Sequence, residues 1–190
     1  VFSYFKMIKT KENYLDSYSS TLNYLVKKQN SNFDILCKKI NTLPKTSRII
    51  ICGNGGSSSI ASHVAVDFSK VLGRTAITFA DDNLITCYAN DYGYANWTSE
   101  ALKVYSNPND LVILISSSGK SQNLINAAKY VKKNKIKLIT LTGFKKNNPL
   151  SKLGDLNIWI ESESYNLVEM THHILLVAVI DRLSISKNDN

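Results

Sequence analysis

The sequence has few cysteines and no long hydrophobic segment. Its three cysteines, Cys37, Cys52 and Cys87, are odd in number and show no CxxC or Cys/His ligand spacing. We therefore expect buried, reduced thiols rather than disulfides or a cysteine metal site. No apolar run approaches the roughly 20 residues that cross a bilayer, and the first six residues lack a basic start followed by a long apolar stretch. These absences predict a cytoplasmic protein with no membrane span.

Concentrated charge of one sign is also missing, although the formal net charge is +8. The lysine clusters stand apart from one another, at the ends of predicted helices or in loops, where solvated charge is the usual interpretation. They are Lys27–Lys28, Lys38–Lys39, Lys132–Lys135 and Lys145–Lys146. A positive field of this kind also attracts small anions. The dispersed charge therefore argues against a nucleic-acid partner and is compatible with an anionic metabolite.

The hydrophobic pattern predicts two N-terminal helices followed by an α/β core. Residues 10–29 carry apolar side chains at helical spacing, and a second amphipathic helix begins near Asn32, a plausible cap, and ends near Pro44. With 190 residues, 44% of them hydrophobic, the chain can bury one core without disulfides. We therefore expect a single domain over residues 1–190, with a helical extension at 1–45 and a core at 46–186.

Three continuous apolar runs predict the centre of a parallel sheet. They span residues 48–52, 111–115 and 137–142, and unbroken β-branched runs suit strands that are covered on both faces. Weaker strands are expected at 75–79 and 156–160. Helical patterns fill the gaps, at 57–72, 82–88, 95–105, 122–134 and 166–185. This alternation predicts an α/β fold, a three-layer α/β/α sandwich around a five-stranded parallel sheet.

Two turns that follow predicted strands are rich in glycine and serine. They are Gly53–Ser59 and Ser116–Ser121. Ligands bind beyond the carboxyl ends of strands in open parallel sheets, and small residues there let N–H groups and hydroxyls converge on an anion at a helix N-terminus. Neither turn has the GxGxxG dinucleotide spacing, and Lys120 lacks the Walker spacing. Either the turns are ordinary helix caps, or they hold a phosphate.

The chain carries Cys-Gly-Asn-Gly-Gly-Ser at 52–57, Asn-Asp-Tyr-Gly-Tyr at 90–94 and the serine-rich segment at 116–121. In this order and spacing, the motifs resemble the sugar isomerase (SIS) domain family, and its phosphoheptose isomerase branch in particular. The resemblance covers nearly the whole chain, including the two N-terminal helices. It implies the SIS fold and a homotetramer that those helices help to hold. It also implies sites completed by neighbouring subunits.

The resemblance also implies where a sugar phosphate binds. The side chains that it places against the phosphate, or in the loop around it, are Ser116, Ser117, Ser118 and Ser121. Those that it places beside the sugar are Asn54, Gly55 and Ser57. It puts Asp91 near the sugar hydroxyls, where a carboxylate suits a diol. From the residues alone, Asp91 can equally be a turn residue before Gly93.

His63 and Asp67 stand four residues apart on the helix predicted after the first loop, and therefore on one face of it. The resemblance implies a metal ligand at His63 and puts Asp67 in the place of the family's catalytic glutamate. Aspartate is one methylene shorter, which retracts the carboxylate from a proton that it must reach. From the residues alone, the two side chains can equally form a surface pair.

The last predicted helix departs from the family pattern. Aligned through Glu169, the family's glutamine and histidine, which complete its metal site, become Val168 and Leu176, and neither can bind a metal or move a proton. We therefore expect that no cofactor is required and that zinc is disfavoured. His172 projects from the same stripe of the helix, so we predict that it replaces the acid/base group, with Glu169 as a second candidate. The alternative is that His172 and His173 are interface residues.

Two functions remain open. The resemblance implies an aldose–ketose isomerase of sedoheptulose 7-phosphate or a similar sugar phosphate, in the synthesis of surface-polysaccharide precursors. This reaction moves a proton between adjacent carbons, and Asp67 and His172 are the expected pair. The alternative is a non-catalytic module that binds a sugar phosphate or a protein partner, which the loss of metal-site residues favours. The apolar stripe from Tyr14 to Leu25 offers a surface for subunits to bury.

Overall fold

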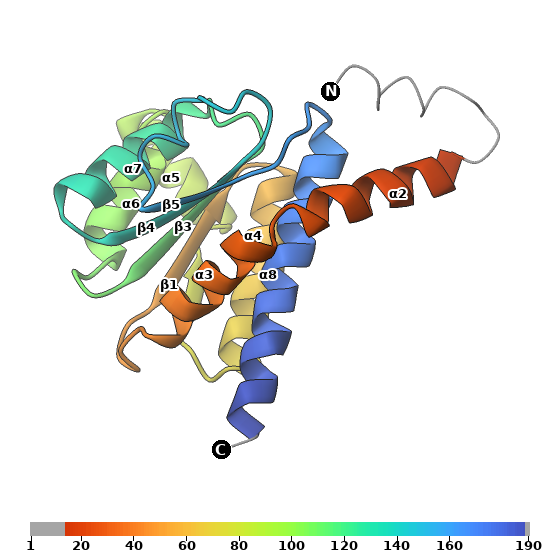
Figure 1. Cartoon of the computed structure of the whole chain (residues 1–190). Helices are drawn as coiled ribbons and strands as arrows, with labels where there is room; N and C mark the ends of the chain where they lie inside the picture. The colour runs from red at the N-terminus through yellow and green to blue at the C-terminus, as the bar shows by residue number, and fades with distance from the viewer. Residues whose placement is uncertain (1–13, 189–190) are drawn as a thin grey trace.

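The computed structural model describes residues 14–188, with side chains up to residue 185, and its centre is a five-stranded sheet. The strands are β1 (Ile49–Gly53), β2 (Ala76–Thr78), β3 (Leu111–Ser116), β4 (Lys137–Thr142) and β5 (Leu156–Trp159). They lie in the order β2-β1-β3-β4-β5, and every neighbouring pair is parallel (Figure 1). Helices connect the strands because parallel neighbours need a crossover. The prediction of a five-stranded parallel sheet is confirmed.

The central strands are hydrophobic throughout because both faces of the sheet are covered. Every residue of β1 and of β3 is buried. Successive side chains alternate between two cores, so that Val112 packs on one face and Ile113 on the other. The edge strands β2 and β5 are shorter and only partly buried. At the edge of the sheet, β2 covers only three residues, fewer than the five predicted at 75–79.

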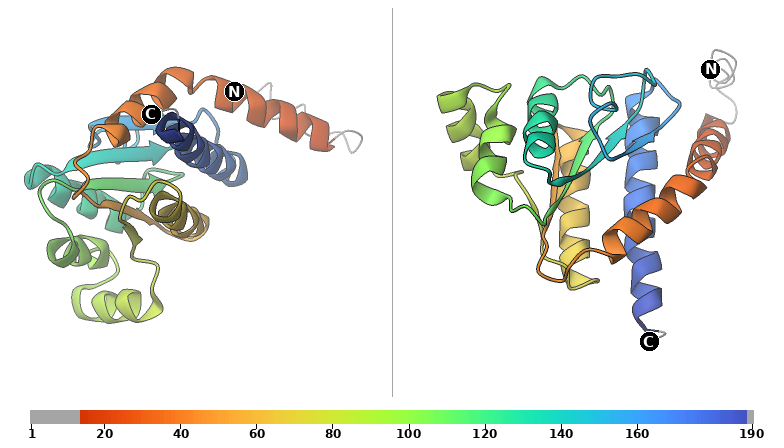
Figure 2. Two further views of the ribbon diagram at one scale, coloured as in Figure 1. Left: turned by 90° about the horizontal axis from the view of Figure 1, so that it is seen from below. Right: turned by 60° about the vertical axis from the view of Figure 1, so that its left-hand side comes forward.

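Helices form a layer on each face of the sheet, as the two views of Figure 2 show. On one face lie α3 (Asn30–Asn41), α4 (Gly56–Lys70) and α8 (Tyr165–Asn188). On the other face lie α5 (Asp82–Tyr92), α6 (Trp97–Tyr105) and α7 (Gln122–Lys133). The predicted three-layer α/β/α sandwich is therefore confirmed, and α4 and α8 pack against each other in one layer.

The first described helix, α2 (Tyr14–Lys27), extends away from the sandwich, and its C-terminal end lies beside α8 (Figure 1). The predicted apolar stripe is divided between two environments. Tyr18, Leu22 and Leu25 pack against the core, whereas 49% of Tyr14 and 78% of Leu15 are exposed. The part of the predicted helix at residues 10–13 lies outside the described residues. The outer half of this helix therefore presents apolar surface that residues 14–185 do not cover.

Two predicted helix boundaries are corrected. The second helix begins at Asn30 with Gln29 as its N-cap residue, and Asn32 does not cap it but donates a hydrogen bond of 2.9 Å to the Gln29 side chain. The helix predicted at 82–88 continues to Tyr92 and ends before Gly93, whose φ is +79°. Asp91 therefore lies in the last turn of α5 rather than in a loop.

The three cysteines are free, as expected, but they differ in burial. Cys52 is buried in β1, where desolvation raises its pKa to about 12. Cys37 is half-buried, and Cys87 is exposed on α5. The prediction of buried thiols is therefore right for Cys52 and wrong for Cys87. Among the described residues, no helix has the length and hydrophobicity that crossing a membrane requires.

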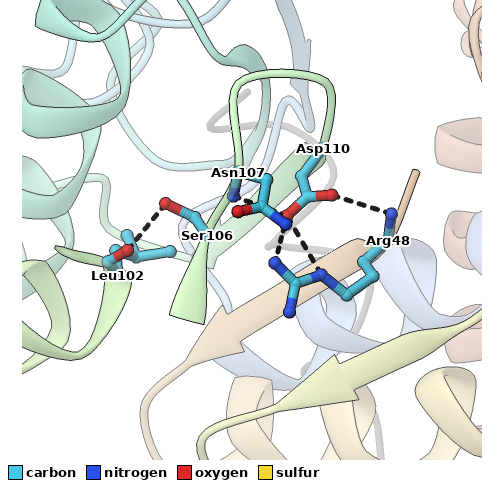
Figure 3. Close-up of polar contacts among 5 residues, drawn as sticks. All are labelled: Arg48, Leu102, Ser106, Asn107 and Asp110. Carbon is cyan, nitrogen blue, oxygen red and sulfur yellow. Dashed lines mark hydrogen bonds and ion pairs between the residues drawn. The ribbon is translucent and has the colours of Figure 1, made fainter. Parts of the chain in front are cut away.

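A buried ion pair joins the starts of the two central strands (Figure 3). Asp110, which is 1% exposed, accepts hydrogen bonds from the Arg48 backbone N–H (2.9 Å) and from its Nε (3.2 Å) and Nη2 (3.0 Å). The Asn107 N–H donates a fourth bond of 2.8 Å. Arg48 and Asp110 immediately precede β1 and β3, so this carboxylate fixes the amino ends of both strands side by side.

We expect Asp110→Ala to lower the free energy of unfolding by about 3 kcal/mol, because it leaves a partly buried guanidinium and two backbone N–H groups without a partner. Urea denaturation measures the loss. Glu100→Ala is the matched control, since it removes a more exposed carboxylate that pairs with Lys103 on α6 and should cost about 0.5 kcal/mol. Equal losses in the two variants would contradict the role given to Asp110.

Candidate functional site

The carboxyl ends of β1 and β3 lie side by side at the point where the strand order reverses. The chain continues from there to β2 on one side and to β4 and β5 on the other. Parallel pairing sets Gly53 opposite Ile115, so Gly53–Ser59 and Ser116–Ser121 leave the sheet at the same edge. Ligands bind at such a switch point in open parallel sheets. The structure thus brings together the two loops that the sequence singled out.

The first loop is a tight turn from β1 into α4. Gly55 is its N-cap, with φ +53° and ψ −126°, a conformation that side chains rarely adopt. The N–H of Ser57 donates to the Asn54 carbonyl at 3.1 Å, and Ser57 is itself buried. Asn54, in contrast, is half-buried at the edge of the sheet. The loop therefore offers Asn54, rather than Ser57, to a ligand.

The second loop is held by contacts within the domain that leave two hydroxyls accessible. Gly119 has φ +64°, and a Cβ there would lie 2.0 Å from Oδ1 of Asn148, so only glycine fits. The buried Ser116 donates a hydrogen bond of 3.2 Å from its Oγ to Oγ of Ser121. Ser121 is the N-cap of α7 but makes no side-chain capping bond. Its hydroxyl, and that of the half-buried Ser118, are therefore available to an anion.

A pair of amides joins the two loops. Nδ2 of Asn54 donates to Oδ1 of Asn123 at 2.9 Å, and Nδ2 of Asn123 donates back to Oδ1 of Asn54 at 3.0 Å. Asn123 also donates to Thr98 at 3.0 Å, and the Tyr94 hydroxyl donates to Oδ1 of Asn54 at 3.4 Å. The sequence interpretation missed Asn123 and Tyr94. The position of Asn123, two residues after the serine loop, was the available signal.

Glu169 on α8 reaches both loops. Its carboxylate lies so close to Gly56 that a Cβ on that residue would be 2.2 Å from Oε2. The hydroxyl of the buried Ser117 lies 3.5 Å from Oε1, at the long limit of a hydrogen bond. Glu169 is thus the predicted acid/base residue that the structure brings to the loops.

Asp91 lies near this site without joining it. It is exposed in the last turn of α5, where Oδ1 accepts a hydrogen bond of 3.0 Å from Asn90. The same segment reaches the first loop through Tyr94 instead. Among the described contacts, none links Asp91 to either loop, so its predicted contact with sugar hydroxyls stays a prediction.

Three side chains form a hydrogen-bonded chain where α4 packs against α8. Nε2 of His173 lies 2.8 Å from Nδ1 of His63, and Nε2 of His63 lies 3.2 Å from Oδ2 of Asp67. The two imidazole rings meet edge to face, with centroids 4.8 Å apart. Burial, and then the neighbouring His63, lower the pKa of His173, and Asp67 partly offsets this. The predicted pair of His63 and Asp67 is therefore extended by His173, which the sequence interpretation considered only as an interface residue.

The role predicted for His172 is corrected by its position. Its ring is fully buried, and Nε2 lies 3.3 Å from the Thr142 carbonyl at the end of β4. Its Nδ1 is buried with no partner among the described residues. Desolvation lowers the pKa of His172 to about 4. A side chain sealed in the core does not reach a substrate, so His172 is not brought together with Asp67.

The argument from Val168 and Leu176 is corrected for the same reason. Both are fully buried in the core, on the line of α8 that also carries His172. The line of α8 that borders α4 carries Glu169 and His173 instead, four residues apart. Val168 and Leu176 therefore lie on a different line of α8 from the one that contacts α4, and the expectation that zinc is disfavoured stays a prediction.

The polar side chains at the contact between α4 and α8 do not fit a metal site in this arrangement. Both ring nitrogens of His63 are engaged, one with Asp67 and one with His173. Within residues 14–185, no three His, Cys, Asp or Glu side chains converge as metal ligands do. A zinc ion would require these contacts to be rearranged.

We expect His172 to make the protein sensitive to acid. Its pKa is lower in the folded state, about 4, than in the unfolded chain, about 6.5, so its contribution to stability is complete above pH 6.5 and is lost as the pH falls to 4. The loss amounts to about 3 kcal/mol. Urea denaturation of His172→Phe and of the original protein from pH 4 to 8 measures it. The difference between the two should change below pH 6.5 and stay constant above it.

Comparisons with known proteins agree with this architecture. A family model described as SIS domain matches residues 13–143. A phosphoheptose isomerase from Campylobacter jejuni subsp. jejuni serotype O:6 is 33% identical over 150 residues, 75% of this chain and 78% of the relative. One from Thermodesulfovibrio yellowstonii is 35% identical over 160 residues, 79% of this chain and 78% of the relative.

A solved structure of a phosphoheptose isomerase from Neisseria gonorrhoeae superposes with a TM-score of 0.82 at 23% identity, over 89% of this chain and 94% of that one. At this identity the likeness shows the fold. The family model spans β1, the first loop, α4, β3 and the serine loop, whereas α8, which carries Glu169, follows the matched residues. The chain therefore belongs to the SIS domain family, in its phosphoheptose isomerase branch.

Proposed function

We propose that this chain is an aldose–ketose isomerase whose substrate is sedoheptulose 7-phosphate or a similar sugar phosphate. Its product would be used in the synthesis of surface-polysaccharide precursors. The observation that carries the proposal is Glu169, a carboxylate that touches both loops at the switch point of the sheet. The curated relatives named phosphoheptose isomerase support the reaction class.

The proposed phosphate site is the serine loop at the start of α7. Ser121 does not cap the helix with its own side chain, so the first-turn N–H groups and the partial positive charge of the helix end are left for an anion. We assign direct phosphate contacts to the hydroxyls of Ser118 and Ser121. Ser116 supports them through its bond to Ser121, and Ser117 orients Glu169.

The proposed sugar site lies between the two loops. Asn54 is held in one orientation by Asn123, which leaves the outer side of its amide and the Tyr94 hydroxyl for sugar hydroxyls. Isomerisation passes through an enediol, so one group must carry a proton between C1 and C2 and another between their oxygens. We assign the oxygen protons to Glu169 because it lies at the loops, where a bound phosphate fixes the sugar chain.

The non-catalytic alternative has lost its main support. It relied on Val168 and Leu176 as replaced metal ligands, and both are fully buried in the core. The facing lines of α4 and α8 keep two imidazoles and two carboxylates, His63, His173, Asp67 and Glu169, and binding alone requires no such set.

We also propose that the chain assembles with copies of itself, as a homotetramer. Support comes from α2, which extends from the sandwich with Tyr14 and Leu15 exposed on its outer half. Apolar surface of this kind is stabilised when another subunit covers it. Light scattering measures the assembly.

The reaction is tested with Glu169→Gln. We expect the original protein to exchange the C1 proton of sedoheptulose 7-phosphate with deuterated water, followed by NMR, and the variant to be slower by about 10²-fold or more, because the amide cannot shuttle protons. Glu163→Gln is the matched control, an exposed glutamate just before α8 that faces neither loop in the described contacts. Undiminished exchange in Glu169→Gln would refute the assignment.

The phosphate site is tested with Ser121→Ala. Loss of one hydrogen bond to a charged group costs about 1.5–3 kcal/mol, so KM for the sugar phosphate should rise about tenfold or more with a smaller change in kcat. Ser184→Ala on α8 is the control, because its hydroxyl bonds only to the Asp181 carbonyl in its own helix. If Ser121→Ala changes kcat and leaves KM unaltered, the phosphate is bound elsewhere.

A further inference from the structure

The hydrogen-bonded chain of His173, His63 and Asp67 has a direction that the atoms determine. A carboxylate only accepts hydrogen bonds, so Nε2 of His63 carries the proton that it shares with Asp67 across 3.2 Å. In neutral His63, Nδ1 then carries no proton and accepts a hydrogen bond of 2.8 Å from Nε2–H of His173. It follows that Nδ1 of neutral His173 also carries no proton and keeps its lone pair free. That nitrogen has no hydrogen-bond partner among residues 14–185.

The spacing of the two rings is that of a hydrogen bond and not of a shared metal. Zinc binds each imidazole nitrogen at about 2.0–2.1 Å, and tetrahedral geometry then separates two such nitrogens by about 3.3 Å or more. The observed separation between Nδ1 of His63 and Nε2 of His173 is 2.8 Å. His63 has no further lone pair to give, because its other nitrogen faces Asp67.

The hydrogen-bonded chain of His173, His63 and Asp67 lies where we place the end of a bound sugar that is remote from its phosphate. Glu169, on the same line of α8 as His173, touches both loops, and four residues along a helix amount to about 6 Å. His173 is half-buried, so part of its side chain is accessible where α8 packs against α4. A sugar held by its phosphate in the serine loop and extended along this line of α8 brings carbons remote from the phosphate towards Glu169 and His173.

We propose that His173 is the catalytic base that moves the proton between C1 and C2. His63 and Asp67 are positioning residues that fix the tautomer of His173, and no metal takes part. The proposal rests on the proposed isomerase function. Nδ1 of His173 takes the proton from C1, and the C–H electron pair forms the C1=C2 bond of the enediol. Glu169 takes the O1 proton and delivers it to O2. The imidazolium then returns its proton to C2 as the carbonyl forms at C1, so protons and electrons balance.

The variants His173→Gln and Asp67→Asn test the proposal. The glutamine amide can still donate to His63 but offers no base, so kcat for sedoheptulose 7-phosphate should fall about 10³-fold, with KM changed less than threefold. Asp67→Asn should lower kcat by a smaller factor, because the base remains while its orientation is lost. Met170→Gln, on an exposed position of the same helix, is the matched control and should keep full activity. Undiminished kcat in His173→Gln would overturn the proposal.

A readout independent of activity is ¹⁵N NMR of the imidazoles in the full chain. We expect both His63 and His173 as Nε2–H tautomers, with a scalar coupling between Nδ1 of His63 and Nε2 of His173 that Asp67→Asn weakens. The opposite tautomer on either ring would overturn the relay. Chelator treatment should leave kcat unchanged, and stoichiometric zinc whose removal abolishes turnover would also refute the proposal.

The outcomes separate this proposal from the proposed function. If the original protein exchanges no proton with any of a panel of ketose and aldose phosphates, isomerisation itself fails and the catalytic role of His173 falls with it. If the original protein exchanges and His173→Gln does so equally well, isomerisation stands and only the assignment of His173 fails.

Discussion

The parallel pairing of β1 with β3 is the constraint on which the site depends. It sets Gly53 beside Ile115, so that two short loops end at one edge of the sheet and two helices begin there. The carboxylate of Asp110 holds the other ends of the same strands through Arg48. A slip of one residue in this pairing would turn every side chain of a strand to the opposite face, which burial on both faces forbids. The loops are therefore positioned by the core and not by one another.

The orientation of α8 about its own axis is the second constraint. One line of the helix, which includes Val168, His172 and Leu176, is buried against the sheet, and the neighbouring line presents Glu169 and His173 to α4. Burying Val168 and Leu176 contributes several kcal/mol, so the apolar side chains of this line determine which residues remain for chemistry. One residue along a helix is a turn of about 100°, and this small difference separates His172 in the core from His173 at the contact with α4.

Polar groups from separate parts of the chain hold one another in the site. Asn54 and Asn123 exchange hydrogen bonds across the two loops, and His63 stands between Asp67 and His173. Each such contact fixes the orientation of a side chain before a ligand arrives, which reduces what binding must order. The same contacts engage both nitrogens of His63, the residue at which the resemblance implies a metal ligand.

The sequence by itself determined the layers, the parallel sheet and the two loops, because continuous β-branched runs and glycine–serine turns are local signals. It also identified Glu169, His63 and Asp67 as polar residues on helices. It chose His172 over His173 as the acid/base residue, and this was wrong, because packing against β4 sends His172 into the core. It missed Asn123 and Tyr94, whose partner Asn54 lies 69 and 40 residues away. Tertiary structure alone decided these points, because a side chain acquires its partners only when the helix that carries it has been packed.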